Sequence, residues 1–303
     1  MTRAAVLGLE WGAALTGAIV TTEGQVLASQ TISTPLTPDA AFEASGVLIQ
    51  GLIDHAAGLN LNIIGIGIGI GAYGQVSPRD GILHSSPLFK TWHDIPIVET
   101  LMYACQIPVI LANATQAAAF LEYESGAAVR ANSALYLHIG HTIESAYLIK
   151  GAIFQGATSS SSMGLLTADW RGEKPVSLNE VVTIPAIQKL YYSRTRIDER
   201  PSYEEIVQLA LSGHALAVKV IRDTARILGT LLHPVATLLE TDLIVVGGDV
   251  PQIGPLWATA FEAAFYANRP LSAAPITLRQ AHYGAYAVLY SVGRLALRDF
   301  LPE

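Results

Sequence analysis

The stretch from Ile107 to Glu122, IPVILANATQAAAFLE, holds the position at which chemistry is most expected in this chain. Its apolar first part indicates a strand, and its alanine-rich second part indicates a helix that begins near Asn113 or Thr115. The junction of a strand end with a helix start is where open α/β sheets place their active sites. No charged residue stands in the stretch before Glu122. The junction therefore offers polar groups, but neither a catalytic acid nor a catalytic base.

A second group has side chains that bind metal ions: His138, His141 and Glu144, spaced three residues apart. Residues three apart on one strand point to opposite faces of a sheet, so we expect no metal site here. We therefore expect His138 to lie on a strand and His141 to lie in a turn. The single cysteine, Cys105, excludes an intramolecular disulfide and a thiolate zinc cage, and we expect it to be a buried apolar thiol.

The composition limits the possible partners. The chain has 303 residues, enough for one large or two medium domains, and 51% of them are hydrophobic. This surplus favours burial between domains or in a homodimer. A net charge of −7 without a basic block argues against nucleic-acid binding. No apolar segment predicts a membrane span, and Glu10 interrupts the apolar start, so we expect a cytoplasmic protein.

The first half of the chain predicts a meander of strands, a helix, a further strand and a second helix. The strands are expected at 4–10, 15–21, 26–33 and 63–70, and the helices at 37–57, with Gly58 as C-cap, and 95–103. The strand 63–70 alternates isoleucine and glycine. One of its faces therefore lacks side chains, and another element must pack tightly there. Residues 72–94 are rich in Gly, Pro and Ser and predict a long loop of functional origin.

The second half begins in the same way, which indicates an internal duplication. Gly12 and Gly24 are 12 positions apart, and Gly140 and Gly151 are 11 apart, each pair marking turns between strands. The expected strands are 133–139, 145–149, one from 152, 243–246 and 276–278. The expected helices are 184–193, 203–211, 214–240, 254–267 and 284–299. Alternating strands and helices predict an α/β class with a mostly parallel sheet in each half.

Five segments in this order resemble the ROK family of sugar kinases, open reading frames and repressors: GLEWG, IIGIGIG, IPVILANATQAAAFLEY, ALYLHIG and LIVVGGDVPQIG. The resemblance covers almost the whole chain. It implies a two-domain, actin-like ATPase fold, a duplicated ribonuclease H-like architecture. Residues 1–116 plus 286–303 would form the N-terminal domain and residues 117–285 the C-terminal domain. It also implies that the final helix packs on the first domain and that a dimer forms; we expect no helix-turn-helix of the kind that the family's repressors carry.

The resemblance assigns candidate ligand contacts. Glycine turns of the family hold nucleotide phosphates, so the candidate cofactor-binding residues are Gly12, Gly140, Gly247 and Gly248. Asn113 matches an asparagine of the family's catalytic string and is the candidate contact for a small carbohydrate-like ligand. Its alternative role is to cap the helix that follows.

Several positions depart from the family pattern. The family's general base is the Asp of a Glu-Asn-Asp-Ala-Asn string, and Ala114 stands at that position. Asp-x-Gly-Gly-Thr of the first turn reads Glu10-Trp11-Gly12-Ala13-Ala14, and Gly-Thr-Gly-x-Gly of the second reads Gly140-His141-Thr142-Ile143-Glu144. Ile143 would hinder the approach of a phosphate and Glu144 would repel it. Leu88 and Leu165 replace sugar and zinc contacts, and the segment from Trp170 to Leu178 lacks the zinc loop's cysteines.

These departures favour a catalytically silent homologue, a pseudokinase that acts by binding, regulation or scaffolding. It would have no catalytic residue, no cofactor and no metal. The alternative is an active, glucokinase-like ATP-dependent sugar kinase with a displaced acid, for which the candidates are Glu10, Asp94, Glu144 and Asp169. A general base contributes about 10²- to 10⁴-fold to a rate, and its absence makes the silent homologue the favoured hypothesis.

Overall fold

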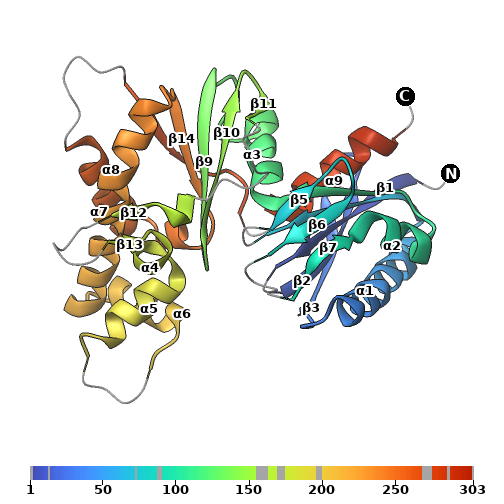
Figure 1. Cartoon of the computed structure of the whole chain (residues 1–303), viewed down its shortest axis with the longest axis horizontal. Coiled ribbons are helices and arrows are strands. Elements are labelled where there is room, and N and C mark those ends of the chain that lie inside the picture. Colours follow the sequence, from blue (N-terminus) through green and yellow to red (C-terminus); the bar gives the residue numbers. More distant parts are fainter. Residues whose placement is uncertain are drawn as a thin grey trace. The chain divides into compact units, whose positions relative to one another are not determined.

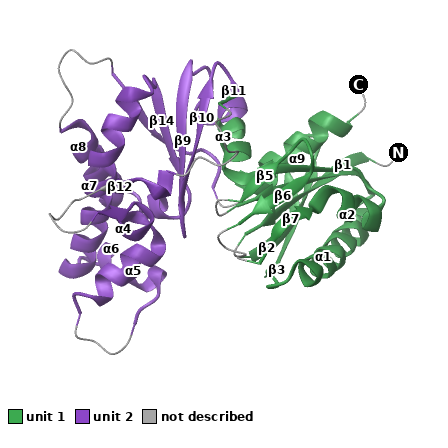
Figure 2. Cartoon of the chain, in the orientation of Figure 1, with its two compact units in different colours: residues 1–122, 153–161, 285–303 green, residues 123–152, 162–284 purple. Residues whose placement is uncertain are grey.

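The computed structural model of the chain contains two compact units (Figures 1 and 2). It describes residues 3–12, 14–71, 74–86, 91–154, 163–168, 175–195, 200–267, 275–284 and 287–301. Unit 1 consists of Met1–Glu122, Ile153–Ser161 and Ala285–Glu303. Unit 2 consists of Tyr123–Ala152 and Ser162–Gly284.

Unit 1 is built on a five-stranded sheet of order β3-β2-β1-β4-β8. Its strands are β1 (Arg3–Trp11), β2 (Ala14–Thr21), β3 (Val26–Ser33), β4 (Leu61–Ile70) and β8 (Val109–Asn113). The first three form an antiparallel meander, and β4 and β8 continue the sheet in parallel with β1. The parallel strands β1, β4 and β8 therefore end at the same edge of the sheet.

One face of this sheet has a stripe of glycines that the helix α9 (Ala287–Phe300) covers. A Cβ atom added to Gly8 would overlap the carbonyl of Leu289, and one added to Gly67 would overlap the carbonyl of Val292. The tight packing expected over the isoleucine–glycine strand is confirmed. The glycines let the α9 backbone lie directly against the strands, where a larger side chain would collide with it.

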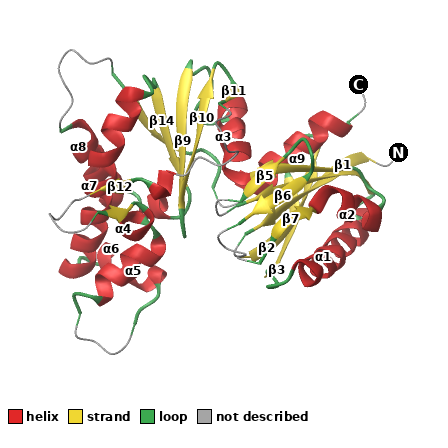
Figure 3. Ribbon diagram, in the orientation of Figure 1, coloured by secondary structure: helices red, strands yellow, loops and turns green. Residues whose placement is uncertain are grey.

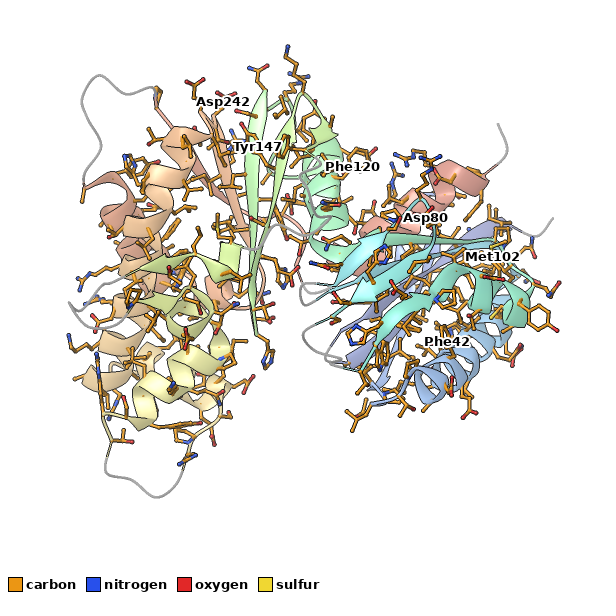
Figure 4. All side chains as sticks on the ribbon, viewed as in Figure 1. Phe42, Asp80, Met102, Phe120, Tyr147 and Asp242 are labelled. Atoms are coloured by element: carbon orange, nitrogen blue, oxygen red, sulfur yellow. The ribbon has the colours of Figure 1, made fainter. Side chains whose placement is uncertain are left out.

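The opposite face packs against α1 (Pro38–Gly58) and α2 (Ile97–Cys105), as the secondary-structure view shows (Figure 3). Trp11 is 1% exposed, and its ring lies 5.4 Å from that of Phe42, which Figure 4 marks on α1. Trp11 is thus a core residue. The helix α1 ends at Gly58, but its C-cap is Leu59 and not the expected glycine. Cys105 is only half-buried, and that burial raises the pKa of its thiol.

The expectation of an unbroken loop over residues 72–94 is wrong. The described part contains β5 (Gln75–Ser77), β6 (Ile82–Ser85) and the start of β7 (His93–Pro96), which form an antiparallel three-stranded sheet. Strands of three or four residues are too short to show a period-2 pattern among Gly, Pro and Ser. The turn between β5 and β6 uses Gly81, whose φ of +72° suits glycine.

Unit 2 repeats the sheet of unit 1. Its order is β11-β10-β9-β14-β15, with β9 and β10 antiparallel and β9, β14 and β15 parallel. The strands are β9 (Ser133–Ile139), β10 (Ile143–Ile149), β11 (Ala152–Ile153), β14 (Leu243–Gly247) and β15 (Thr277–Gln280). Both sheets place the first strand of the meander in the centre, so the duplication indicated by the glycine spacing is present in the topology.

Helices make up most of the rest of unit 2. They are α4 (Asn179–Val182), α5 (Ile184–Tyr192), α6 (Tyr203–Leu211), α7 (Ala215–Leu238) and α8 (Pro255–Tyr266). Short segments are η1 (Met163–Leu165), η2 (Val250–Ile253), β12 (Thr167–Ala168) and β13 (Val176–Ser177). The helix α3 (Ala114–Ser125) runs from unit 1 into unit 2. Among the described residues, no helix has the length and apolar character that a membrane span requires.

Candidate functional site

In unit 1, the ends of the parallel strands bring a carboxylate close to two glycines. Glu10 Oε1 is 3.7 Å from the position that a Cβ atom would take on Gly12 and 3.8 Å from that on Gly71. Glu10 also pairs across the sheet with Gly69, whose Cβ position lies 3.5 Å from Ala114 Cβ. The candidate Gly12 therefore lies beside the acid Glu10. The methyl group of Ala114 lies near β4, the strand that pairs with Glu10.

Asn113 ends β8 and is 2% exposed. Its Oδ1 accepts a hydrogen bond from the backbone N–H of Gln116 at 3.0 Å, so Asn113 caps α3, the alternative role considered from the sequence. Its Nδ2 is buried and has no hydrogen-bond partner within the described chain. Buried polar groups are rarely left unpaired, so this amide has donor capacity that a ligand could use.

Ala114 is the first residue of α3 and is 3% exposed. The first acid of that helix, Glu122, is buried at 1% exposure and lies about two turns further along. Asp94 forms an exposed pair with His84, with Nδ1 and Oδ1 2.7 Å apart. Asp169 and Leu88 lie outside the described residues. Glu10 is thus the displaced-acid candidate that the structure places beside the strand ends of unit 1.

In unit 2, the turn after β9 matches the turn after β1. Gly140 N donates to the carbonyl of Thr142 at 2.9 Å, as Gly12 N donates to that of Ala14 at 3.1 Å. Ile143 N donates to Asn179 Oδ1 at 3.0 Å. The backbone N–H groups of Gly140 and Ile143 are therefore already used within the protein, which reduces what this turn can offer to an anion.

Acidic side chains surround the same turn. Asp249 Oδ2 is 3.2 Å, and His138 Nε2 is 3.5 Å, from the Cβ position on Gly140. Glu144 pairs directly opposite His138 and accepts a hydrogen bond from Thr142 Oγ1 at 3.2 Å. His138 and Glu144 thus share a face of the sheet, as directly opposite residues of an antiparallel pair do. Even so, the described residues contain no group of three potential ligands arranged to hold a metal ion.

Gly247 is the last residue of β14, and Gly248 follows it next to this turn. A Cβ atom on Gly247 would lie 2.7 Å from Tyr136 Oη, and one on Gly248 would lie 2.6 Å from the backbone N of Ile139. Gly248 also has a φ of +89°. Close packing against β9 accounts for both glycines. The structure brings Gly248 against the backbone of Ile139, the residue before Gly140, and the candidacy of both glycines as cofactor contacts stays a prediction.

A cavity of about 390 Å³ lies beside the turn, between it, η2, α5 and α6. Its apolar wall consists of Ile184, Val207 and Ile253. Its polar lining consists of His141, Tyr203, Glu204, Gln208, Asp249 and Gln252. Sequence reasoning missed this cavity because four separate stretches of the chain supply its lining. The acid directly after Gly247-Gly248 was the one available signal.

Two groups that line the cavity, Tyr203 and Glu204, have shifted pKa values. Burial, together with the nearby carboxylates of Asp249 and Glu204, raises the pKa of Tyr203 above its usual range. Hydrogen bonds from its own backbone N–H and from the Ser202 hydroxyl, with His141 nearby, lower the pKa of the exposed Glu204. Glu204 is therefore ionised at neutral pH, and Tyr203 remains neutral there.

Comparison with known proteins agrees with this architecture. The ROK family model matches residues 6–298. A glucokinase of Streptomyces coelicolor is 23% identical, over 81% of this chain and 81% of that protein. A transcriptional regulator of Mycobacterium bovis is 25% identical, over 64% of this chain and 47% of the regulator. A xylose repressor of Bacillus subtilis is 22% identical, over 55% of this chain and 44% of the repressor. The chain thus spans about half the length of the regulators that it matches.

Solved structures show the same fold. A ROK family glucokinase from Streptomyces griseus, in complex with glucose and AMPPNP, superposes with a TM-score of 0.85 at 19% identity, covering 97% of this chain and 99% of that one. A ROK family transcriptional regulator, a homologue of the E. coli MLC protein, superposes with a TM-score of 0.86 at 22% identity, covering 99% and 80%. The predicted fold class, the actin-like fold of the sugar kinases, is confirmed. This chain belongs to the ROK family.

Proposed function

We propose that this chain is a catalytically silent member of the ROK family, which binds a small carbohydrate-like ligand for a regulatory or scaffolding purpose. The observation that carries the proposal is Ala114 at the start of α3, where the family resemblance requires a general base. A buried methyl group, 3% exposed, cannot accept a proton from a sugar hydroxyl. Relatives that are kinases and relatives that are regulators are both compatible with a binding role.

The turn of unit 2 supports the absence of phosphoryl transfer. Phosphoryl transfer depends on donors and cations that stabilise the charge on the phosphate oxygens. Here Gly140 and Ile143 use their N–H groups within the protein, and Asp249 places a carboxylate oxygen against Gly140. A nucleotide phosphate in this place would meet negative charge and few free donors.

Asn113 supports the binding role. Its Oδ1 is used as the helix cap, and its buried Nδ2 has no partner within the described chain. A hydroxyl-rich ligand would supply the acceptor that this amide lacks.

The net charge of −7 supports a function without nucleic acid. The apolar surplus supports the homodimer, and we place the protein in the cytoplasm on the sequence argument given above.

The alternative, an active sugar kinase with a displaced acid, is favoured by one observation. Glu10 is the carboxylate beside Gly12 and Gly71, next to the strand that passes Ala114. In this hypothesis Glu10 would act as the base.

A coupled ADP-release assay tests the two hypotheses. The substrates are common hexoses and N-acetylhexosamines with MgATP, and the Streptomyces coelicolor glucokinase serves as positive control. We expect no sugar-dependent ADP formation by this chain, because Ala114 leaves the sugar hydroxyl without a base. Turnover at ordinary kinase rates would overturn the silent hypothesis, and its loss in Glu10→Gln would establish the alternative.

A further inference from the structure

We propose that the cavity of unit 2 binds a small organic cation, an amine-bearing molecule with an apolar body. The inference rests on the proposed function and extends it, because it gives the cavity of unit 2 a ligand other than a nucleotide. Four features carry it: the size of the cavity, its apolar wall, the sign of its charges, and the surroundings of the neighbouring glycine turn.

The cavity has the size and the wall of a small-molecule site. Its volume of about 390 Å³ lies at the lower end of the range typical of such sites, roughly 300–1,000 Å³. Ile184, Val207 and Ile253 supply apolar surface from α5, α6 and η2. Ile184 and Ile253 are each 6% exposed, so this wall belongs to the packed core of unit 2. The wall suits the hydrocarbon part of a ligand.

The polar lining carries negative charge. Glu204 at the start of α6 and Asp249 before η2 are carboxylates, and Gln208 and Gln252 add neutral amides. Among the described residues that line the cavity, none is a lysine or an arginine. Glu204 and Asp249 place two acidic side chains in the lining, and their carboxylates attract an ammonium group. The ring of Tyr203 adds a face on which a cation can lie.

Local structure holds these acids in place. The Ser202–Glu205 capping box fixes the start of α6, directly beside Glu204. The carbonyl of Asp249 accepts from the backbone N–H of Gln252 at 3.2 Å, and the Tyr203 hydroxyl lies 3.5 Å from that carbonyl. The backbone that carries both acids is therefore held by hydrogen bonds at the starts of α6 and η2.

The glycine turn argues against an anionic ligand in the same place. Asp249 Oδ2 lies 3.2 Å from the Cβ position on Gly140. An anion close to the Gly140 backbone would therefore lie next to that carboxylate, and like charges at such distances repel. A cation in the adjoining cavity is stabilised by the same group.

Titration calorimetry of the full chain with tyramine tests the inference, with para-ethylphenol as the uncharged analogue of the same shape. We expect saturable binding of tyramine, and binding of para-ethylphenol at least about tenfold weaker. Glu204→Gln and Asp249→Asn should each weaken tyramine binding about two- to fivefold, as expected for partly exposed charge pairs. Added salt should weaken it as well.

Glu262→Gln is the matched control, because it removes an exposed carboxylate from α8 that does not line the cavity. It should leave the affinity for tyramine unchanged. Thermal melting of each variant confirms that it folds. Because the Glu204 side chain is exposed, Glu204→Gln should not disturb folding, and it tests the inference independently of Asp249→Asn.

Absence of tyramine binding, equal binding of the two probes, or binding that neither cavity variant changes would each overturn the inference. None of these results affects the silent-homologue proposal, because that proposal fails only on sugar-dependent turnover of ATP. The two failures are therefore distinguishable.

Discussion

The two ends of the Asn113 amide differ in their surroundings. Its Oδ1 caps α3 through the Gln116 N–H, while its Nδ2 remains buried without a partner in the described chain. Sequence reasoning identified both roles as alternatives. It could not decide between them, because one amide has two ends and each end can have its own function.

Substitution of Asn113 separates these roles. Asn113→Ala should lower the free energy of unfolding by about 1 kcal/mol, the usual cost of a lost N-cap. Asn113→Ser should cost less, because its hydroxyl can still accept from the Gln116 N–H. Thermal melting of both variants is the measurement, and equal losses would show that the cap contributes nothing.

Tyr203 gives unit 2 a dependence on alkaline pH. Burial and the carboxylates of Asp249 and Glu204 raise the pKa of its phenol, so the folded state favours the neutral form. Its contribution to stability is complete below the unfolded pKa of about 10 and is lost as the pH rises through the folded pKa. Tyr203→Phe should therefore lose less stability than the wild type at alkaline pH.

Melting temperatures measured between neutral and strongly alkaline pH check this prediction. The matched control is Tyr103→Phe, since Tyr103 is 84% exposed. Its alkaline loss should equal that of the wild type. An unchanged alkaline loss in Tyr203→Phe would contradict the argument.

At the scale of elements, the glycine stripe on β1 and β4 determines how α9 packs. Substitution of Gly67 by Ala would drive a methyl group into the carbonyl of Val292. We expect a loss of about 1–3 kcal/mol or more, typical of overpacking. Gly46→Ala in α1 is the control, because nothing lies within 4 Å of its Cβ position. It should stabilise the chain by about 0.5–1 kcal/mol.

Chemical denaturation of the two variants makes the comparison. Opposite signs are expected for the same chemical change. A harmless Gly67→Ala would mean that α9 does not approach the strands as closely as described.

The elements also show where sequence reasoning succeeds. The alternation of isoleucine and glycine predicted tight packing over β4, and the glycine spacing predicted the repeated meander. Both patterns lie within short stretches of the sequence, so they can be recognised without the structure. The small sheet β5-β6-β7 was missed, because its strands are too short to carry a pattern.

At the scale of the whole molecule, the fold was predictable and the cavity was not. Order and spacing of motifs extend over the entire chain and identify the family. The cavity depends on Ile184, Tyr203 and Asp249, which only the tertiary structure brings together. A sequence pattern reports what each segment resembles, and a cavity is lined by segments whose proximity no pattern records.

The intact chain should respond weakly to nucleotide. A ligand stabilises the folded state by RT ln(1 + [L]/Kd), about 2.7 kcal/mol when its concentration is 100 times Kd. With acids around Gly140 and few free N–H donors, we expect millimolar MgATP to shift the melting temperature by less than about 1 °C. Differential scanning fluorimetry measures this, with the Streptomyces coelicolor glucokinase as comparison. A shift of several degrees would show a working nucleotide site.

The helix α9 also has a bearing on synthesis. Unit 1 begins with β1 but needs residues 287–300 to cover the glycine faces of β1 and β4. The ribosome makes this helix only after all of unit 2. Domains usually fold as they emerge, the N-terminal one first. The glycine face of the first strands of unit 1 therefore stays uncovered until α9 is made, whereas unit 2 can already fold. A nascent chain stalled before α9 should therefore engage chaperones through its first half.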